Sequence, residues 1–522
     1  MGIVGLLALW MLRIPSVVQP MASDQGLYAY AGVRLLAGDA PYAGAWDQKP
    51  PGIHVVYAAL WAIWPHESVV AGADLVAAAV VSLLLIVIGR RRLTEGIGFG
   101  AAAAFLFFGN PALTYRVGGI FARAQCETFI ALAIAAALAL AAAPRRTRTH
   151  LIAIGVLLGA AFWLKYNAAP YALTVLVALW AWRDDGLAPG RTWIGEVVSV
   201  GVAGLATVLV PLGLMAVAGA TTDLYLATIT YNAQYSGETY AGLGGLLQYA
   251  ATFPIDRARN DALWFVGALG MVLTLGHLLR GMAPEWRAGA LVCAAWLLGA
   301  WLSILINGGR GLPQYFVQAY PALALAAAVG LAPVVNAARA RHVALAVAVV
   351  GAVTYGAHRA SDFGGLAESL RADWAALTGR TPRAEYLARF GGRPSDKYVA
   401  GAIADLATLV RATTAPSDTI YVFGWAPGVP VLTDRRSASR FHWSQPVLRE
   451  FEAGRPGYGS EGLAADLLLE RPALIALHFD SWAEGGRHSA QVFHERPVLN
   501  DVLMAHYTQE ATVDRFEIWR RR

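Results

Sequence analysis

Charged residues are scarce in this 522-residue sequence. Only 15% of its residues are Asp, Glu, Lys or Arg, whereas a soluble globular domain carries about a quarter. Hydrophobic residues make up 57% of the chain, and its mean hydropathy is +0.47. Apolar runs of about 16 to 25 residues recur along it, long enough to cross a hydrocarbon core as helices. The composition therefore excludes an ordinary soluble protein and indicates a multi-span membrane protein.

Lysine and cysteine are rarer still. The three lysines are Lys49, Lys165 and Lys397, so arginine supplies nearly all of the basic residues behind the net charge of +6. These arginines lie between the apolar runs, where membrane topology accounts for them. The basic excess therefore does not indicate a nucleic acid partner, and none is expected. The cysteines Cys126 and Cys293 lie in or beside separate apolar segments, which argues against a structural disulfide.

The usual motifs of soluble enzymes are missing as well. The sequence has no P-loop, no GxSxG elbow and no HExxH zinc motif. Its eleven histidines are scattered without the spacing of metal ligands. The sequence thus carries no signature of a P-loop nucleotide site, a serine hydrolase or a zinc enzyme, while dependence on a divalent metal stays open.

Arginine clusters orient the apolar runs, because basic residues gather on the cytoplasmic side of a membrane protein. The clusters are Arg90–Arg92, Arg145–Arg148, Arg183 with Arg191, Arg280 with Arg287, and Arg339 with Arg341. If all are cytoplasmic, the chain crosses the membrane about eleven times, with its amino terminus inside and its carboxyl terminus outside. The expected spans are 2–20, 69–89, 97–115, 127–143, 150–164, 168–182, 193–217, 262–279, 288–306, 317–335 and 343–358. The first is expected to remain as a signal anchor.

Two parts outside the spans carry structure of their own. The first external loop (21–68) is expected to form two interfacial helices, over 25–38 and 53–64, which Pro50-Pro51-Gly52 separates. After 358, charged residues become frequent and helix-then-strand patterns predict a small α/β domain. Its expected elements are helices over 397–414 and 462–472 and strands over 419–425, 473–479 and 511–521. The predicted organisation is a transmembrane domain over 1–358 and an extracytoplasmic domain over 359–522.

The first external loop carries candidates for chemistry, because ionisable side chains near a bilayer are costly unless they are solvated, paired or used. Asp24 begins the first helix of the loop, and Tyr28 lies one turn further along the same face. Asp24 is equally well explained as the N-cap of that helix. Lys49 precedes two prolines that keep the backbone extended. Its alternative role is to reach lipid phosphates without a specific ligand.

Other external segments add charged residues. Lys165 lies at a tight turn, and two lysines on that side of the membrane, Lys49 and Lys165, could hold a phosphate as compact point charges. Glu127 stands at the mouth of a span, where an ion pair with Arg123 at i, i+4 is the alternative to a chemical role. Arg310, beside flexible glycines, either binds an anion or faces lipid headgroups.

The first external loop resembles a known family. Residues 23–52 read SDQGLYAYAGVRLLAGDAPYAGAWDQKPPG. An acidic residue, a tyrosine-rich stretch, a Pro-Tyr pair and a Lys-Pro-Pro turn follow one another as in the first periplasmic loop of the GT-C membrane glycosyltransferases. Here they are Asp24, Tyr28, Tyr42 after its proline, and Lys49. The pattern is most similar to the bacterial dolichyl-phosphate-mannose-protein mannosyltransferase-like enzymes and the aminoarabinose transferase of lipid A.

Three further segments share the resemblance. GAAFWLKYNAAP (159–170) is similar to a glycine-rich span of the family that ends in a lysine. GGRGLPQYFVQAYPALALAAA (308–328) resembles its Arg…His-Tyr-Phe…Pro segment, but Gln314 stands where histidine is common, so a role of that histidine does not carry over. DTIYVFGWAPGVPVLTDRRSASRF (418–441) looks like the exported carboxyl-terminal domain of bacterial members.

The resemblance implies a polytopic α-helical GT-C fold that takes a sugar from a polyprenyl-phosphate carrier and transfers it to a glycan, lipid or protein acceptor. This chemistry would lie outside the cytoplasmic membrane and need no nucleotide. The implied catalytic residues are Asp24, as general base, and Glu127. The carrier phosphate would be held by Lys49, Lys165 and Arg310. The substrate pocket would contain Tyr28, Tyr42, Asp47, Arg123, Gln314 and Tyr315. Some relatives bind divalent ions, but three carboxylates, Asp24, Asp47 and Glu127, are too few to predict a metal site.

Two other functions stay open from the residues. A transporter or flippase of a lipid-linked sugar would place polar residues at the bilayer midplane, often in repeated halves. Charges inside the spans are few here and no repeat is evident, which favours the enzyme. A non-catalytic scaffold that keeps the fold is the third possibility, and Asp24 and Lys49 argue against it. Deletion of 359–522 is expected to spare donor binding.

Overall fold

The computed structural model describes residues 2–113, 117–183, 192–237, 240–279, 284–339, 343–392, 396–480 and 486–522. Three arginines that were used to orient the spans, Arg191, Arg280 and Arg341, lie outside these residues. The chain divides into two compact units. The first unit comprises Met1–Val17, Ala71–Leu214 and Gln234–Asp373, and the second comprises Val18–Val70, Met215–Ala233 and Trp374–Arg522.

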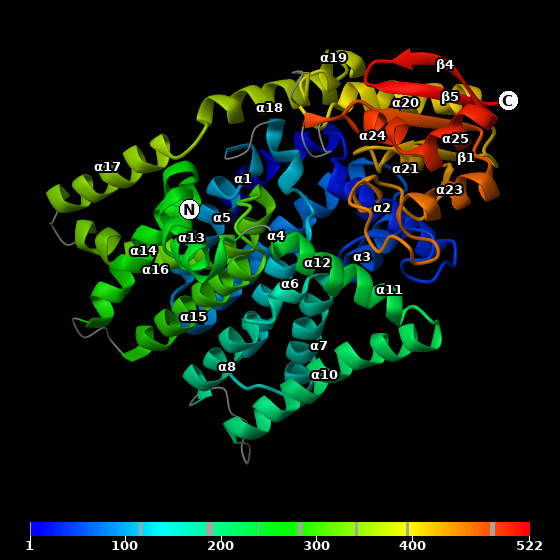
Figure 1. Cartoon of the computed structure of the whole chain (residues 1–522). Helices are drawn as coiled ribbons and strands as arrows, with labels where there is room; N and C mark the ends of the chain where they lie inside the picture. Colours follow the sequence, from blue (N-terminus) through cyan, green and yellow to red (C-terminus); the bar gives the residue numbers. More distant parts are fainter. Residues whose placement is uncertain are drawn as a thin grey trace. The chain divides into compact units, whose positions relative to one another are not determined.

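The first unit is built from helices and short 3-10 turns (Figure 1). The α-helices that lie wholly or mostly in it are α1 (Ile3–Met11), α4 (Ser68–Arg92), α5 (Glu95–Phe108), α6 (Cys126–Ala141), α7 (Arg148–Leu164), α8 (Tyr171–Ala181), α10 (Trp193–Val217), α12 (Tyr231–Gly237), α13 (Gly242–Asn260), α14 (Ala262–Leu279), α15 (Pro284–Ile306), α16 (Tyr320–Arg339), α17 (Val343–Arg359) and α18 (Phe363–Leu377). The 3-10 turns are η1 (Ile14–Val18), η2 (Pro111–Leu113), η3 (Val117–Ala122), η4 (Tyr166–Ala168) and η6 (Pro313–Ala319).

Each of the eleven predicted spans contains a helix in the structure. Within the part of the chain that the structure describes, the helices long and apolar enough to cross a membrane are Ser68–Arg92, Trp193–Val217, Ala262–Leu279, Trp286–Ile306 and Pro313–Pro333. There is a sixth if the apolar segments Ile3–Val18 and Ser23–Leu36 count as one broken span. The helices α5 to α8 are shorter, so the count of eleven spans stays a prediction.

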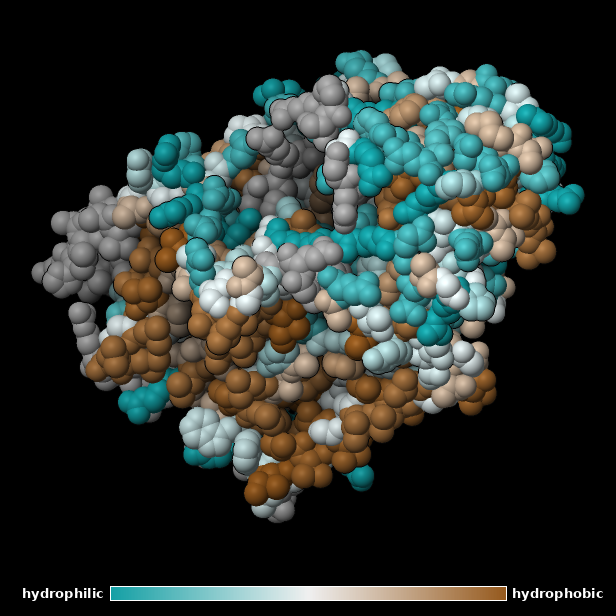
Figure 2. Space-filling view, viewed as in Figure 1, coloured by the Kyte–Doolittle hydropathy of each residue, from teal (hydrophilic) through white to brown (hydrophobic). Residues whose placement is uncertain are grey.

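Small residues allow the helices of the first unit to pack closely. A side chain at Gly330 of α16 would meet the Gly270 carbonyl oxygen of α14 at 2.1 Å, so the two backbones touch at this point. Elsewhere large apolar side chains point outward. The helix α10 exposes Ile194, Val202 and Leu209, and Figure 2 shows hydrophobic residues gathered over it. Such an outer face suits a lipid environment rather than water.

The second unit combines the first external loop with the carboxyl-terminal residues. Its helices are α2 (Ser23–Leu36), α3 (Gly52–Ile63), α11 (Thr221–Tyr225), the π-helical η5 (Leu226–Thr230), α19 (Arg383–Leu387), α20 (Ala400–Thr413), α21 (Val429–Thr433), α22 (Gln445–Leu448), α23 (Gly459–Glu470), α24 (Ser489–Glu495) and α25 (Pro497–His506). Its strands are β1 (Thr419–Phe423), β2 (Arg436–Ser437), β3 (Leu474–His478), β4 (Tyr507–Val513) and β5 (Phe516–Arg521). The predicted interfacial helices of the loop are thus confirmed as helices, and α3 begins directly after the Pro50-Pro51 break.

The strands form one five-stranded sheet in the order β2-β1-β3-β5-β4. The central strands β1 and β3 are parallel, with Ile420 opposite Leu474, and β5 pairs antiparallel with both β3 and β4. The predicted helices and the first two strands are confirmed within a few residues. The single closing strand over 511–521 is wrong, because the chain turns at Asp514, where φ is +47°, and forms a hairpin.

Aromatic side chains form the centre of the second unit and join its three segments. Trp46 from the first loop is fully buried, with Tyr231 at 5.1 Å and Phe451 at 5.7 Å between ring centroids. The Trp46 amide donates to the Arg440 carbonyl at 2.8 Å, and the Trp443 indole donates to the Trp46 carbonyl at 3.0 Å. The division at 358 and 359 stays a prediction, while compact packing groups 18–70 and 215–233 with the carboxyl-terminal residues.

Candidate active site

Asp24 lies in the first turn of α2 rather than at its cap. The N-cap position is Ala22, whose amide donates to the Gln25 side chain at 2.6 Å. The alternative in which Asp24 caps this helix is therefore wrong. The Asp24 side chain belongs to a half-buried residue, so it can meet a ligand or water while its helix is held by packing.

One face of α2 packs on the carboxyl-terminal residues of the second unit. The Ser23 hydroxyl donates to the Trp425 carbonyl at 3.5 Å, and the Tyr30 hydroxyl accepts from the Ser437 amide at 2.8 Å. Between these contacts, a side chain at Gly26 would meet the Gly428 backbone nitrogen at 2.7 Å. Only glycine permits this approach, and α2 is consequently fixed against the loop that follows β1.

A second face of α2 packs on α3, and Asp24 lies beside it. The rings of Tyr28 and Tyr57 are 5.5 Å apart in an edge-on arrangement. Successive residues turn by about 100° around a helix, so Asp24 is only about 40° from Tyr28 and lies on the same side of α2. The predicted sharing of a face by Asp24 and Tyr28 agrees with this geometry.

Asp47 and His54 form a buried pair in the same unit. The His54 Nε2 and the Asp47 Oδ2 are 2.9 Å apart, and both side chains are almost fully buried. Burial raises the pKa of the Asp47 carboxyl, but the hydrogen bond from His54 and the charge of Lys49 outweigh it, so the net pKa is lowered. Burial lowers the pKa of the nearby His442 to about 4, which leaves that ring neutral at pH 7.

Lys49 lies in the middle of this loop and is partly buried. The Tyr42 hydroxyl donates to the Lys49 carbonyl at 2.9 Å, while the Tyr42 ring stands 6.3 Å from the His54 ring. Tyr28 approaches the same imidazole at 6.4 Å. The structure thus gathers the predicted residues Tyr28, Tyr42 and Asp47 around His54, a residue that the sequence did not single out, and Tyr42 links the Lys49 backbone to this group.

The first unit holds a second set of predicted residues. The Lys165 ammonium contacts the Glu127 carboxylate at 2.7 Å and stands 4.3 Å from the centre of the Tyr315 ring. Glu127 is nearly fully buried, so the lysine compensates its charge. The predicted ion pair between Glu127 and Arg123 is wrong: Arg123 pairs with Asp74 at 3.1 Å instead.

The segment from 307 to 319 contains the predicted residues Arg310, Gln314 and Tyr315. Arg310 and Gln314 are partly buried in the first unit. The polar residue buried most deeply there is Gln318, whose side chain accepts from the Ser303 hydroxyl at 2.6 Å and from the Tyr171 hydroxyl at 3.3 Å. Gln318 therefore acts as a packing centre between helices, one that the pattern alone did not reveal.

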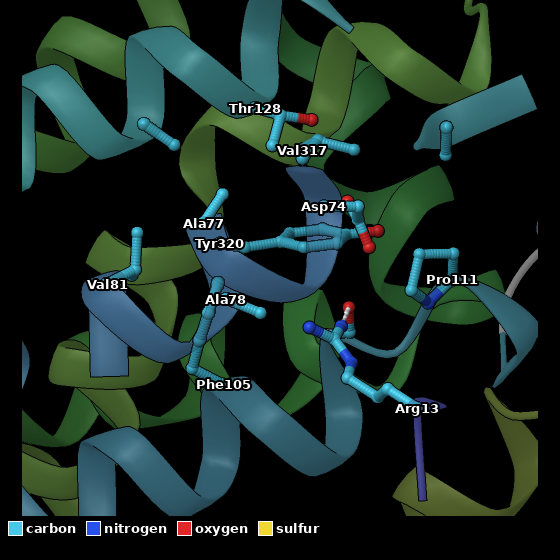
Figure 3. Close-up of a pocket in the computed structure, with 13 residues that line it drawn as sticks. Arg13, Asp74, Ala77, Ala78, Val81, Phe105, Pro111, Thr128, Val317 and Tyr320 are labelled. Carbon is cyan, nitrogen blue, oxygen red and sulfur yellow. Dashed lines mark hydrogen bonds between the residues drawn. The ribbon is translucent and has the colours of Figure 1, made fainter. Parts of the chain in front are cut away.

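The first unit also contains a small, partly open cavity of about 30 Å³, shown in Figure 3. Arg13, Asp74 and Tyr320 supply most of its polar lining, and their polar groups face the same part of it in Figure 3. Arg13 donates to the Gly109 carbonyl, and its Nε is buried without a hydrogen-bond partner among the described residues. This volume holds about one or two waters and is too small for a sugar.

The predicted site residues fall into both units. Asp24, Tyr28, Tyr42, Asp47 and Lys49 lie in the second unit, and Arg123, Glu127, Lys165, Arg310, Gln314 and Tyr315 lie in the first. Among the described residues, no group of three or more His, Cys, Asp or Glu side chains is arranged to hold a metal ion. The residues missed by sequence reasoning are His54 and Asp74. For His54, the one sequence signal was its position seven residues after Asp47, across two prolines.

The fold is similar to that of known membrane glycosyltransferases. ArnT from Cupriavidus metallidurans bound to undecaprenyl phosphate has a TM-score of 0.57 and 16% sequence identity, with 98% of this chain and 96% of that chain covered. The same protein in its apo state has a TM-score of 0.56 and 15% sequence identity, with the same coverage of both chains. The oligosaccharyltransferase of Archaeoglobus fulgidus in its apo form has a TM-score of 0.49 and 13% sequence identity, with 94% of this chain and 72% of that chain covered. No protein-family model and no curated protein sequence matches the chain. The predicted GT-C resemblance is confirmed at the level of the fold.

Proposed function

We propose that this protein is an integral-membrane glycosyltransferase that moves a hexose or pentose from a polyprenyl-phosphate carrier to an acceptor on the periplasmic side of a bacterial inner membrane. The observation that carries the proposal is the first external loop, where a half-buried Asp24 and a partly buried Lys49 stand on a scaffold fixed by packing. The amino terminus would be cytoplasmic and the carboxyl-terminal residues periplasmic.

The reaction needs one bond to form and one to break. The acceptor hydroxyl oxygen attacks the anomeric carbon of the sugar, and the bond from that carbon to the phosphate oxygen breaks. Asp24 takes the hydroxyl proton as general base. The carrier phosphate leaves with the electron pair, and Lys49 compensates its growing negative charge where the dielectric constant is low.

Glu127, Lys165 and Arg310 have supporting roles in the proposal. The Glu127 carboxylate contacts the Lys165 ammonium at 2.7 Å, and a carboxylate can accept further hydrogen bonds, so Glu127 would orient a substrate hydroxyl by accepting its hydrogen. Lys165 is shared between Glu127 and the Tyr315 ring, and a phosphate would have to compete with both for its ammonium group. Arg310 is a further candidate for the carrier phosphate, as the resemblance implies. The likeness to ArnT bound to undecaprenyl phosphate supports a carrier of this class.

Transfer from a panel of polyprenyl-phosphate sugars, measured on purified protein in lipid, tests the proposal. We expect turnover with one donor and a loss of about a hundredfold or more in kcat for Asp24→Asn, the size of a lost general base. Asp39→Asn is the matched control, because Asp39 belongs to the same loop but pairs at 2.7 Å with Arg34 near the surface.

The outcomes separate the open functions. Activity that is retained in Asp39→Asn and absent in Asp24→Asn supports the enzyme and identifies the donor sugar. Donor binding without turnover, identical in wild type and Asp24→Asn, would replace the enzyme by a transporter or an inactive scaffold. Movement of the donor across sealed vesicles then distinguishes those two.

A further inference from the structure

The Asp47–His54 pair closes the segment that carries Lys49. The pair joins residues seven apart through the 2.9 Å contact, and the segment between them contains Lys49, Pro50 and Pro51. Each proline fixes one backbone torsion, so few conformations remain once the ends are joined. The Tyr42 hydroxyl, bonded to the Lys49 carbonyl at 2.9 Å, holds the segment from the other side.

The pair is costly for the fold if packing is its only purpose. Asp47 is 1% exposed, and its Oδ1 is buried without a hydrogen-bond partner among the described residues. A buried polar atom left unsatisfied costs about 1–3 kcal/mol, and more when it is charged. An apolar pair of similar size would fill this space without that cost. The unsatisfied oxygen therefore calls for a role beyond packing.

The surroundings of His54 connect the pair to the proposed site. The His54 ring lies between Tyr28 and Tyr42, at 6.4 Å and 6.3 Å from their rings. Tyr28 lies one helical turn from Asp24 on α2. His54 is itself 2% exposed, so it reaches a substrate only through its neighbours. One of these neighbours, Tyr42, is bonded to the backbone of Lys49, and Lys49 has the charge that the carrier phosphate requires.

We propose that Asp47 and His54 are positioning residues that act together to hold Lys49 at the carrier phosphate. This inference rests on the proposed function and assigns Asp47 to Lys49 instead of to the substrate pocket. The His54 Nε2–H donates to the Asp47 carboxylate, which fixes the tautomer and the orientation of the ring. Asp47 in turn provides a fixed negative charge two residues from Lys49, so that the ammonium group is oriented before the carrier arrives.

A double-mutant cycle with Lys49 tests whether the pair acts through that lysine. The variants are His54→Phe, His54→Gln and Asp47→Asn, each in the wild-type and the Lys49→Met background. In the wild-type background we expect His54→Phe and Asp47→Asn to raise the Kd for polyprenyl phosphate and the donor KM by about tenfold or more. A misplaced Lys49 ammonium group could raise either constant by up to about a hundredfold. His54→Gln, which keeps a donor to Asp47, should recover most of the loss. In the Lys49→Met background none of the three should matter further.

The control is His66→Asn, an exposed histidine of the same loop that contacts Ser68. Equal losses in both Lys49 backgrounds would overturn the proposal, because the pair would then act independently of Lys49. Losses that follow thermal unfolding, with no recovery in His54→Gln, would also overturn it and leave packing as the role.

A failed proposed function would be recognised separately. Binding of polyprenyl phosphate alone, measured without any sugar acceptor, is followed in the same cycle. Binding that follows the expected pattern while wild type transfers no sugar would refute the enzyme and keep the positioning role. Wild type that neither binds the carrier nor transfers sugar would refute both.

Discussion

Buried ion pairs hold several of the candidate residues in place, and the pair of Glu127 with Lys165 is the clearest case. Their charged atoms are 2.7 Å apart, and Glu127 is 1% exposed. Removing one partner of a buried pair leaves an uncompensated charge, which costs about 3–5 kcal/mol. We therefore expect Lys165→Met to lower the stability by an amount of this order, measured by thermal unfolding in detergent.

The double variant Glu127→Gln/Lys165→Met is the control for this prediction. Because it removes both charges, it should recover most of the stability that Lys165→Met loses. If Lys165→Met alone is as stable as wild type, the ion pair does not contribute to the stability of the fold. Sugar transfer should be lost in both variants if Glu127 has the proposed role.

The partner of Glu127 illustrates what the sequence could predict at this scale. The sequence identified Asp24, Lys49 and Glu127 as candidates, because ionisable side chains near a bilayer are costly unless they are solvated, paired or used. It paired Glu127 with Arg123, since only neighbours at i, i+4 are visible in a sequence. The structure instead pairs Glu127 with Lys165, 38 residues away in the chain, and Arg123 with Asp74, 49 residues away. Helix packing alone brings them together.

At the scale of elements, α2 depends on a glycine contact. A side chain at Gly26 would stand 2.7 Å from the Gly428 nitrogen and 2.8 Å from its Cα, both of them backbone atoms. We expect Gly26→Ala to lower the stability of the protein by about 1–3 kcal/mol, as overpacking does. Thermal unfolding in detergent measures this loss.

Gly72→Ala in α4 is the matched control, since nothing lies within 4 Å of the added carbon. Alanine in a helix is favoured over glycine by up to about 1 kcal/mol, so this variant should be neutral or more stable. Equal effects of Gly26→Ala and Gly72→Ala would mean that the contact between α2 and the loop after β1 is not tight.

Secondary structure was predictable where one signal dominates. Pro50-Pro51 set the start of α3, a run rich in β-branched residues gave β1, and a short apolar run gave β3. The hairpin of β4 and β5 was missed because its turn is a single Asp514-Arg515 step inside an otherwise strand-like sequence. The two-residue β2 has too few residues for any periodicity.

At the scale of the whole chain, compact packing adds distant segments to the carboxyl-terminal residues that composition alone sets apart. Composition changes near 359, but compactness groups 18–70 and 215–233 with 374–522. Asp223 shows why: it accepts from the Tyr458 hydroxyl at 2.6 Å and pairs with Arg440 at 3.2 Å. Such contacts join residues more than 200 positions apart, and composition carries no trace of them.

This packing changes what we expect from removal of the carboxyl-terminal residues. Trp46 is fully buried against Phe441, Trp443 and Phe451, so a chain ending at Asp373 would expose it together with the face of α2. The first external loop, and Lys49 with it, would lose the support that fixes it. We therefore predict that this truncation abolishes polyprenyl-phosphate binding, contrary to the expectation from sequence.

Full-length Trp443→Ala separates this effect from general misfolding. It removes one indole and its 3.0 Å hydrogen bond to the Trp46 carbonyl but leaves the sheet in place. The large-to-small change costs about 3–5 kcal/mol in a core, and carrier binding should weaken in step with greater protease sensitivity of residues 37–51. If the truncated chain binds the carrier as wild type does, the loop folds without the carboxyl-terminal residues. Those residues would then have to serve the acceptor or a partner, because support of the loop would no longer explain their packing.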